Sequence, residues 1–223
     1  MQDPGYVRSA FARIAERYVL ANHVLSLGID VRWRRKVAAI VRAFAPARVL
    51  DLATGTGDLA AAVQAACPQA LVVGADFCLP MLAEAKRRGV PHLLAADGMR
   101  LPVADAAFDT VTIAFGLRNM ASWAGAAREM ARVLRPGGHL VVLDFSLPGG
   151  LLRGGYRFYL HRVLPRLAGW ITRQRAAYEY LASSIESFPA GPAMVALLVE
   201  NGFVRAQARP LTGGITSIYV ADR

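Results

Sequence analysis

The stretch that decides the fold is Arg48-Val-Leu-Asp-Leu-Ala-Thr-Gly-Thr-Gly-Asp58. Its first half is a short apolar run that is typical of a buried strand, and Leu59 to Ala66 is typical of a helix. Between them, Gly55 and Gly57 allow a sharp turn and a close approach of the backbone to a ligand. This order predicts a nucleotide-type binding site, with the ligand at the carboxyl end of the strand and against the first amides of the helix.

The glycine turn alone does not distinguish between two nucleotide cofactors. Gly55 to Ala60 fits the loose G-x-G-x-x-A form of the dinucleotide fingerprint, and Asp76 follows at about twenty residues, where that fingerprint expects an acid. NAD and S-adenosylmethionine (AdoMet) are both compatible with this pattern. The choice between them depends on the neighbouring acidic residues.

Three aspartates end three successive predicted strands, and together they favour AdoMet. Asp51 is placed to meet the amino group of a zwitterionic ligand, which NAD does not offer. Asp76 is placed to accept both ribose hydroxyls, because an ionised carboxylate has two acceptor oxygens. Asp97, followed by Gly98, is placed to meet the exocyclic amine of adenine. The alternative, in which these aspartates serve only as helix caps and turn residues, stays open here.

Length and composition predict one domain without a membrane-spanning segment. The chain has 223 residues, 55% of them hydrophobic, yet no run approaches the roughly 18 apolar residues that cross a bilayer. Met1 to Gly5 lacks the charged-then-apolar pattern of a secretion signal. Cys67 and Cys78 have no metal-ligand spacing, so we expect free thiols, no metal site and a cytoplasmic location.

The net charge of +10 admits three explanations. Nearly all the basic residues are arginine, as in a plain compositional bias. Two basic groups, within residues 32–36 and 153–175, flank apolar or aromatic stretches, as at a contact with an anionic membrane surface. A nucleic-acid ligand is disfavoured, because it would require basic residues interleaved with aromatic ones or gathered in one run.

From Arg48 onwards, strands and helices alternate with short connections, which predicts a parallel sheet with right-handed crossovers. Towards the C-terminus we expect a helix over residues 193–200 and an antiparallel pair of strands over 203–209 and 215–221. The expected strands before it are residues 48–52, 71–75, 92–96, 108–115 and 139–145, and the expected helices are 58–66, 79–88 and 123–134.

Two segments outside this alternation are predicted to be helical caps on a core of residues 47–146. Residues 1–46 contain a pattern for an amphipathic helix over 7–20, a loop over 22–30 and a helix over 31–44 that ends before Pro46. Residues 147–192 are helical in composition, aromatic and basic. We expect these parts, with the helix and strands of 193–223, to form one domain.

Several stretches resemble the UbiE/Coq5-type quinone C-methyltransferases, a family that includes the demethylmenaquinone methyltransferases. The resemblance covers nearly the whole chain, with departures such as Val19 in place of a usual Asp and Asp144 in place of a usual Glu. The glycine turn and Arg132-Val-Leu-Arg-Pro-Gly-Gly138 occur in class I methyltransferases generally. The stretches particular to the family are Phe115-Gly-Leu-Arg-Asn119 and Tyr178-Glu-Tyr-Leu-Ala-Ser-Ser-Ile-Glu-Ser-Phe-Pro189.

The resemblance implies a Rossmann-like α/β fold of the class I methyltransferases, with a seven-stranded, mostly parallel sheet, an antiparallel terminal strand and helical caps. It implies AdoMet as cofactor and a reduced polyprenyl quinone as substrate, either demethylmenaquinol or the benzoquinol of ubiquinone synthesis, methylated on a ring carbon. The implied cofactor-binding residues are Asp51, Thr54, Gly55, Thr56, Gly57, Asp76, Phe77, Asp97, Gly98 and Ala114.

Methylation of a ring carbon requires a deprotonated ring hydroxyl, and the implied catalytic residues are Arg118 and Asn119. Arg118 would favour the quinolate or orient a water that takes the proton, and Asn119 would bond a ring oxygen. In the alternative interpretation, Arg118 is a structural ion-pair partner and Asn119 caps a strand end. Tyr156, Tyr159 and Tyr178 line the quinone and prenyl channel or belong to the core.

A prenylated substrate would explain the basic, apolar caps, because the enzyme would dock on the inner face of the cytoplasmic membrane. The main rival is a class I methyltransferase of another small phenolic or polyketide-like acceptor. An RNA methyltransferase, an NAD oxidoreductase and an AdoMet-binding protein without turnover are further alternatives. The sequence leaves the quinone ring, the prenyl length and the oligomeric state open, a homodimer included.

Overall fold

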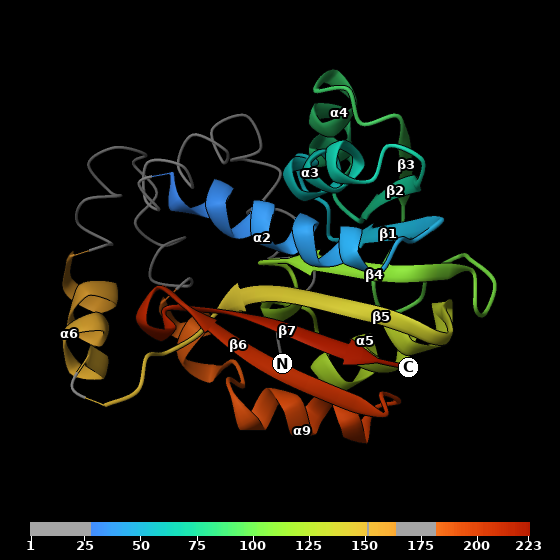
Figure 1. Cartoon of the computed structure of the whole chain (residues 1–223). Coiled ribbons are helices and arrows are strands. Elements are labelled where there is room, and N and C mark those ends of the chain that lie inside the picture. The colour runs from blue at the N-terminus through green and yellow to red at the C-terminus, as the bar shows by residue number, and fades with distance from the viewer. Residues whose placement is uncertain (1–27, 151, 164–181) are drawn as a thin grey trace.

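The computed structural model describes residues 28–150, 152–163 and 182–223. A seven-stranded sheet with the order β3-β2-β1-β4-β5-β7-β6 runs through this part of the chain (Figure 1). The predicted helix over 7–20 lies outside the described residues. The strands are β1 (Arg48–Leu52), β2 (Leu71–Asp76), β3 (His92–Ala95), β4 (Phe108–Ala114), β5 (Leu134–Phe145), β6 (Arg205–Leu211) and β7 (Thr216–Asp222).

The pairing of the strands confirms the expected mixed sheet. β1 pairs in parallel with β2 and with β4, and β4 pairs in parallel with β5. β7 is antiparallel to both β5 and β6. Two strand boundaries were wrong by more than one residue: β5 begins at Leu134 rather than at residue 139, and β6 spans Arg205–Leu211 rather than residues 203–209. Leu134 pairs with Phe108, and regular pairing resumes at His139 after an irregularity that contains Gly137, whose φ is +74°.

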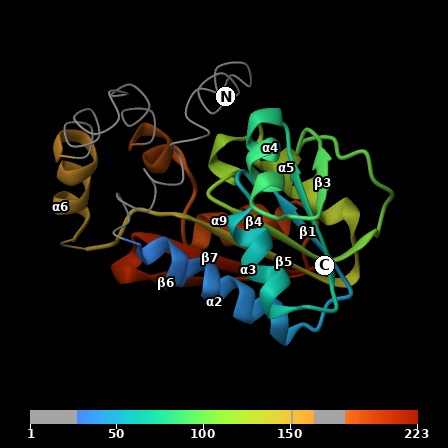
Figure 2. The same cartoon turned by 90° about the horizontal axis from the view of Figure 1, so that it is seen from above.

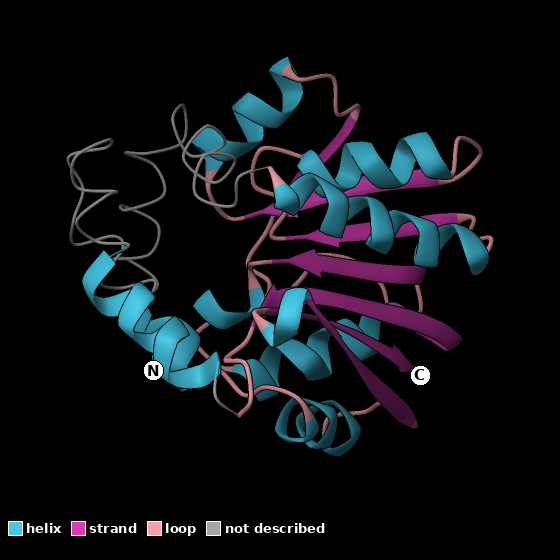
Figure 3. Ribbon diagram, turned by 60° about the vertical axis from the view of Figure 1, so that its left-hand side comes forward, coloured by secondary structure: helices cyan, strands magenta, loops and turns pink. Residues whose placement is uncertain are grey.

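Helices cover both faces of the sheet (Figure 3). α2 and α3 pack on one face and α5 and α9 on the other, so alternate residues of β1 face opposite cores: Val49 the first, Leu50 and Leu52 the second. Burial on both faces explains why β1, β2 and β4 are rich in apolar residues. The helices are α2 (Ile29–Ala43), α3 (Asp58–Ala66), α4 (Leu79–Arg87), α5 (Trp123–Val133), α6 (Leu152–Phe158) and α9 (Pro192–Glu200), with short helices η1 (Leu117–Asn119), η2 (Tyr159–Val163) and η3 (Thr212–Gly214).

Helix α2 begins two residues before the expected start, inside the predicted loop. Gly28, with a φ of +73°, precedes it, and Asp30 in its first turn forms a buried ion pair with Arg34 one turn later. An acidic residue in the first turn interacts favourably with the helix dipole, which helps to extend the helix towards Gly28.

The described part of the second cap lies at the edge of the fold, where α6 stands apart from the sheet (Figures 1 and 2). Leu160 of η2 is buried with Ala182 and Ile185, and this small cluster packs against Phe145 and Tyr156. None of the helices in residues 28–150, 152–163 and 182–223 has the length and apolar character needed to cross a bilayer. The division of the chain into caps and core stays a prediction.

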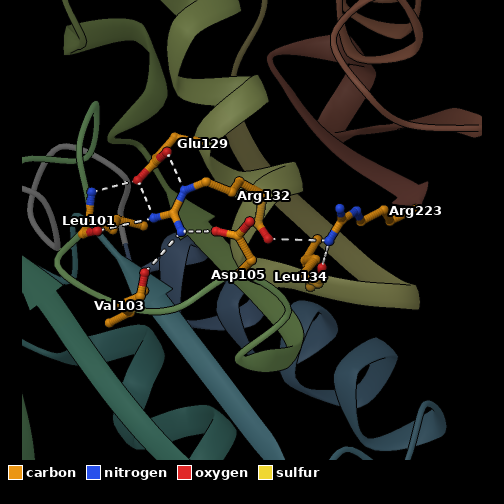
Figure 4. A network of polar contacts seen from close by, with 7 residues as sticks. All are labelled: Leu101, Val103, Asp105, Glu129, Arg132, Leu134 and Arg223. Carbon is orange, nitrogen blue, oxygen red and sulfur yellow. Dashed lines mark hydrogen bonds and ion pairs between the residues drawn. The ribbon is translucent and has the colours of Figure 1, made fainter.

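Arg132 of α5 holds the connection between β3 and β4 in place (Figure 4). Its guanidinium donates to five acceptor atoms at 2.6 to 3.1 Å, three of them on that connection. The acceptors are both carboxylate oxygens of Glu129, the carbonyls of Leu101 and Val103, and the carboxylate of Asp105.

We expect Arg132→Lys to lower the free energy of unfolding by about 1–3 kcal/mol, measured by urea denaturation. A lysine ammonium lacks the planar fork and leaves several of these acceptors without a donor. The matched control is Arg205→Lys, because Arg205 is 70% exposed and bonds only to Asp222 among the described residues. The control is expected to cost less than about 0.5 kcal/mol. Equal losses in the two variants would contradict this account of the network.

Candidate active site

A cavity of about 440 Å³ opens at the carboxyl ends of β1, β2 and β4. Parallel strands present these ends at one edge of the sheet, so the residues that follow each strand meet there. Gly57 does not line the cavity. Its φ is +82°, and a Cβ there would lie 2.5 Å from Val90 Cγ2, so it serves the close packing of α3. The predicted residues that do line the cavity are Asp51, Thr54, Gly55, Thr56, Asp76, Phe77, Asp97, Gly98, Ala114 and Asn119.

Asp51 lines this cavity near the end of β1 and is 1% exposed. One carboxylate oxygen accepts the hydroxyl of Thr54 at 2.7 Å and the other accepts that of Thr112 at 2.7 Å. Burial raises the pKa of Asp51 to about 6, against the two hydroxyls and the charge of Arg34, which lower it. Asp51 is therefore an acid with a charge that changes near neutral pH.

Asp76 ties the glycine turn to the end of β2. One oxygen of its carboxylate accepts the amide of Gly55 at 2.8 Å, and the other accepts the amide of Cys78 at 2.9 Å. Burial raises the pKa of Asp76, and these amides oppose the shift. The amide of Phe77 is a third donor to this carboxylate, and its four lone pairs leave acceptor capacity for a ligand.

Asp97 follows β3 and is the most accessible of the three aspartates. Its Oδ1 accepts the amide of Met99 at 2.9 Å, which orients the carboxyl group at the cavity wall. Gly98 forms the adjacent wall, where an added Cβ would lie 2.6 Å from the Met120 side chain. A larger residue at this position would displace the methionine and narrow the cavity.

Two strained turns meet at the rim of the cavity. Ala53, after β1, has a φ of +51°, and Phe115, after β4, has a φ of +58°. Residues other than glycine rarely adopt such angles, and those that do concentrate at functional sites. Gly116 allows the two turns to come close, because a Cβ at this position would lie 2.5 Å from Ala53 Cβ. The close contact explains why the segment after β4 needs a glycine.

Arg118 and Asn119 are placed differently from one another. Asn119 lines the cavity, and its amide nitrogen donates to the carbonyl of Phe115 at 3.3 Å. Arg118 does not line the cavity; it is 4% exposed and pairs at 2.6 Å with Asp144, which is fully buried at the end of β5. Its guanidinium lies 5.3 Å from the ring centre of Phe145. The ion pair considered as an alternative for Arg118 is thus present, and a catalytic role stays a prediction.

Tyr156 and Tyr159 do not line the acidic cavity either. They come from α6 and η2, and their rings stack at 6.3 Å between centres. Burial raises the pKa of Tyr156, while the positive charge of Arg118 lowers it, so the phenol lies within electrostatic reach of the guanidinium. Tyr178 lies outside the described residues. The two tyrosines therefore lie near Arg118 and not in the acidic cavity.

Arg34 is one of the cavity residues that sequence reasoning did not assign to the site. It belongs to the basic group of residues 32–36, but it is only 9% exposed. The available signal was its position beside Trp33 on the buried face of the predicted helix, together with an acid, Asp30, one turn earlier.

The donor and acceptor set fits a zwitterionic nucleoside such as AdoMet. Three aspartates from successive strands line the cavity, and one of them, Asp51, is buried enough to prefer a cationic partner. Phe77, Met81 and Met120 add apolar surface for a base. Asp76 keeps free lone pairs at a site where a ribose would be held.

Comparison with known proteins agrees with this geometry. The model of the ubiE/COQ5 methyltransferase family matches residues 2–223. A demethylmenaquinone methyltransferase of Thermus thermophilus is 50% identical over 96% of this chain and 99% of the relative, and the ubiquinone/menaquinone biosynthesis C-methyltransferase UbiE of Syntrophotalea carbinolica is 45% identical over 97% and 93%. A SAM-dependent methyltransferase of Thermotoga maritima shares the fold, with a TM-score of 0.61 at 16% identity over 95% and 97%. The chain belongs to the ubiE/COQ5 methyltransferase family.

Proposed function

We propose that this protein transfers a methyl group from AdoMet to a ring carbon of a reduced polyprenyl quinone. The observation that carries the proposal is the 50% identity, along nearly the whole of both chains, with a relative named demethylmenaquinone methyltransferase. A second relative is named for both ubiquinone and menaquinone biosynthesis. We therefore propose demethylmenaquinol as the substrate and the benzoquinol of ubiquinone synthesis as the alternative substrate.

In this proposal the three aspartates hold the cofactor, which when bound supplies an activated methyl group at its sulfonium. Asp76 accepts from the ribose with the acceptor capacity that its main-chain amide donors leave unused. Asp97 accepts the adenine amine at the more open end of the cavity. Asp51 meets the ammonium group of the methionine moiety at the buried end.

The substrate ring is proposed to lie where Asn119 reaches the cavity, near Phe115. Asn119 bonds a ring oxygen. Arg118 acts through its charge, because Asp144 holds its guanidinium at 2.6 Å and a guanidinium does not release its proton near neutral pH. A fixed positive charge in a buried setting favours the quinolate over the quinol. Asp144 is in this view a positioning residue.

The proposal predicts label on the ring carbon in an anaerobic assay with methyl-labelled AdoMet and a reduced short-chain demethylmenaquinol, followed by mass spectrometry. Arg118→Ala should lower kcat by about 10²- to 10³-fold through loss of quinolate stabilisation. Arg135→Ala is the matched control, because Arg135 is 55% exposed and pairs with Asp109 at the opposite end of β4 and β5. Tight AdoMet binding without label would favour another phenolic or polyketide-like acceptor.

The affinity for S-adenosylhomocysteine, which keeps the ammonium group, should depend on the charge of Asp51. An ammonium ligand favours the ionised carboxylate, so binding is strongest above the free-enzyme pKa of about 6 and weakens as pH falls through it. Calorimetry should find binding about tenfold weaker at pH 5 than at pH 7. The control ligand is 5′-methylthioadenosine, which lacks the amino acid and should bind alike at both pH values. Asp51→Asn should remove the pH dependence; a dependence that persists in this variant would rule out Asp51.

A membrane contact is proposed at the surface formed by α6 and η2. Leu152 and Phe158 are 63% and 64% exposed there. The same twelve-residue stretch contains Arg153, Arg157 and Arg162 and no acidic residue, while Glu186 from elsewhere in the chain pairs with Arg157 at 2.7 Å. Exposed apolar side chains within a basic surface fit an anionic bilayer, from which a polyprenyl quinol would be drawn.

Phe158→Glu should lower co-sedimentation with phosphatidylglycerol vesicles at low salt by at least about fivefold, because it removes an apolar insertion and adds a repelled charge. The matched control is Val204→Glu, since Val204 is 82% exposed and lies between α9 and β6, away from this surface. Equal loss in both variants, or no sedimentation of the unaltered protein, would refute the contact.

A further inference from the structure

The charges around the cavity are unbalanced in a way that involves Arg34. Four aspartates line it: Asp51, Asp58, Asp76 and Asp97. Within the described part of the chain, Arg34 is the one basic residue among the lining residues. A ligand with an anionic group would therefore find a single side chain there with which to pair.

Arg34 is held in place on its outer side. Its guanidinium pairs with Asp30 within α2 and lies 5.5 Å from the ring centre of Phe115. Among the described residues, Asp30 is the only hydrogen-bond acceptor that it contacts. A guanidinium has five N–H donors, so most of them are available to a ligand in the cavity.

Arg34 also reaches the cavity from a helix that packs against α3, the helix that follows the glycine turn. Its charge lowers the pKa of both Asp51 and Asp58, so all three groups lie within electrostatic reach of one another. Asp58 already has partners, since it accepts Arg88 at 2.6 Å and Thr56 at 2.8 Å. Asp51 and Arg34 are thus the opposite charges that remain for a ligand in this part of the cavity.

We propose that Arg34 binds the carboxylate of the methionine moiety of AdoMet, while Asp51 binds its ammonium group. The inference rests on the proposed function only in taking AdoMet as the ligand. An α-amino acid presents opposite charges on adjacent atoms, and the cavity presents one cation and one anion at the same end. Helix α2, which precedes the sheet in the chain, in this way becomes part of the cofactor site.

Decarboxylated AdoMet tests the assignment on the unaltered protein, because it differs from AdoMet only in lacking the carboxylate. Isothermal titration calorimetry should find it about 10- to 100-fold weaker than AdoMet, as expected for the loss of a charge-assisted hydrogen bond. Equal affinities would overturn the role of Arg34 and leave the AdoMet site intact. Failure to bind AdoMet at all would overturn the proposed function together with the assignment.

The variant Arg34→Gln gives a second test with the same two ligands. This variant should lose the same factor in affinity for AdoMet while its affinity for decarboxylated AdoMet stays unchanged or rises. An equal loss for both ligands would overturn the assignment, as would unchanged AdoMet affinity with a raised KM for the quinol. The matched control is Arg35→Gln, on the exposed face of the same helix, which should bind both ligands as the unaltered protein does.

The buried Asp30 loses its ion-pair partner in Arg34→Gln, which could unfold α2. The paired variant Asp30→Asn with Arg34→Gln removes both charges and should give the same ligand pattern. Circular dichroism of each variant establishes that it is folded before the titrations are compared.

Discussion

The hydrogen bonds of the Asp76 carboxylate hold the site in shape. By accepting the amides of Gly55 and Cys78, this one side chain joins the turn after β1 to the start of α4 after β2. The parallel pairing of β1 with β2 brings the two turns to the same edge of the sheet. A carboxylate that accepts main-chain amides cannot move without leaving buried donors unpaired, which is costly. The cavity is consequently built around a fixed anion.

Phe115 occupies the boundary between the two halves of the site. Arg34 approaches its ring at 5.5 Å and Arg118 at 6.0 Å, and each guanidinium is anchored by its own aspartate. Phe115 itself has a φ of +58°, held by the close contact between Gly116 and Ala53. The backbone strain therefore positions the aromatic ring that separates the acidic cavity from the buried pair of Arg118 and Asp144.

In the proposed function, cofactor binding and substrate activation depend on different charged residues. Binding of a cationic, zwitterionic cofactor needs several anions and one cation, which the acidic cavity presents with Arg34. Stabilisation of an anionic substrate needs a positive charge, which in the proposed function is that of Arg118, 6.0 Å from the ring centre of Phe115 and 5.3 Å from that of Phe145. Asp144 neutralises part of the charge of Arg118, but it also fixes the orientation of the guanidinium, as a buried ion pair does when its geometry is good.

The parallel core of the sheet and the aspartates at its strand ends were predictable from the amino-acid sequence, because apolar runs, glycines and acids at the ends of strands are local patterns. The glycine turn alone did not separate NAD from AdoMet, and the family match resolved that choice. Only the tertiary structure decided that Arg34 faces the cavity while Arg118 is buried against Asp144. The environment of an arginine depends on partners distant in the chain, as with Phe115 beside Arg34 and Asp144 beside Arg118, and no local pattern encodes those contacts.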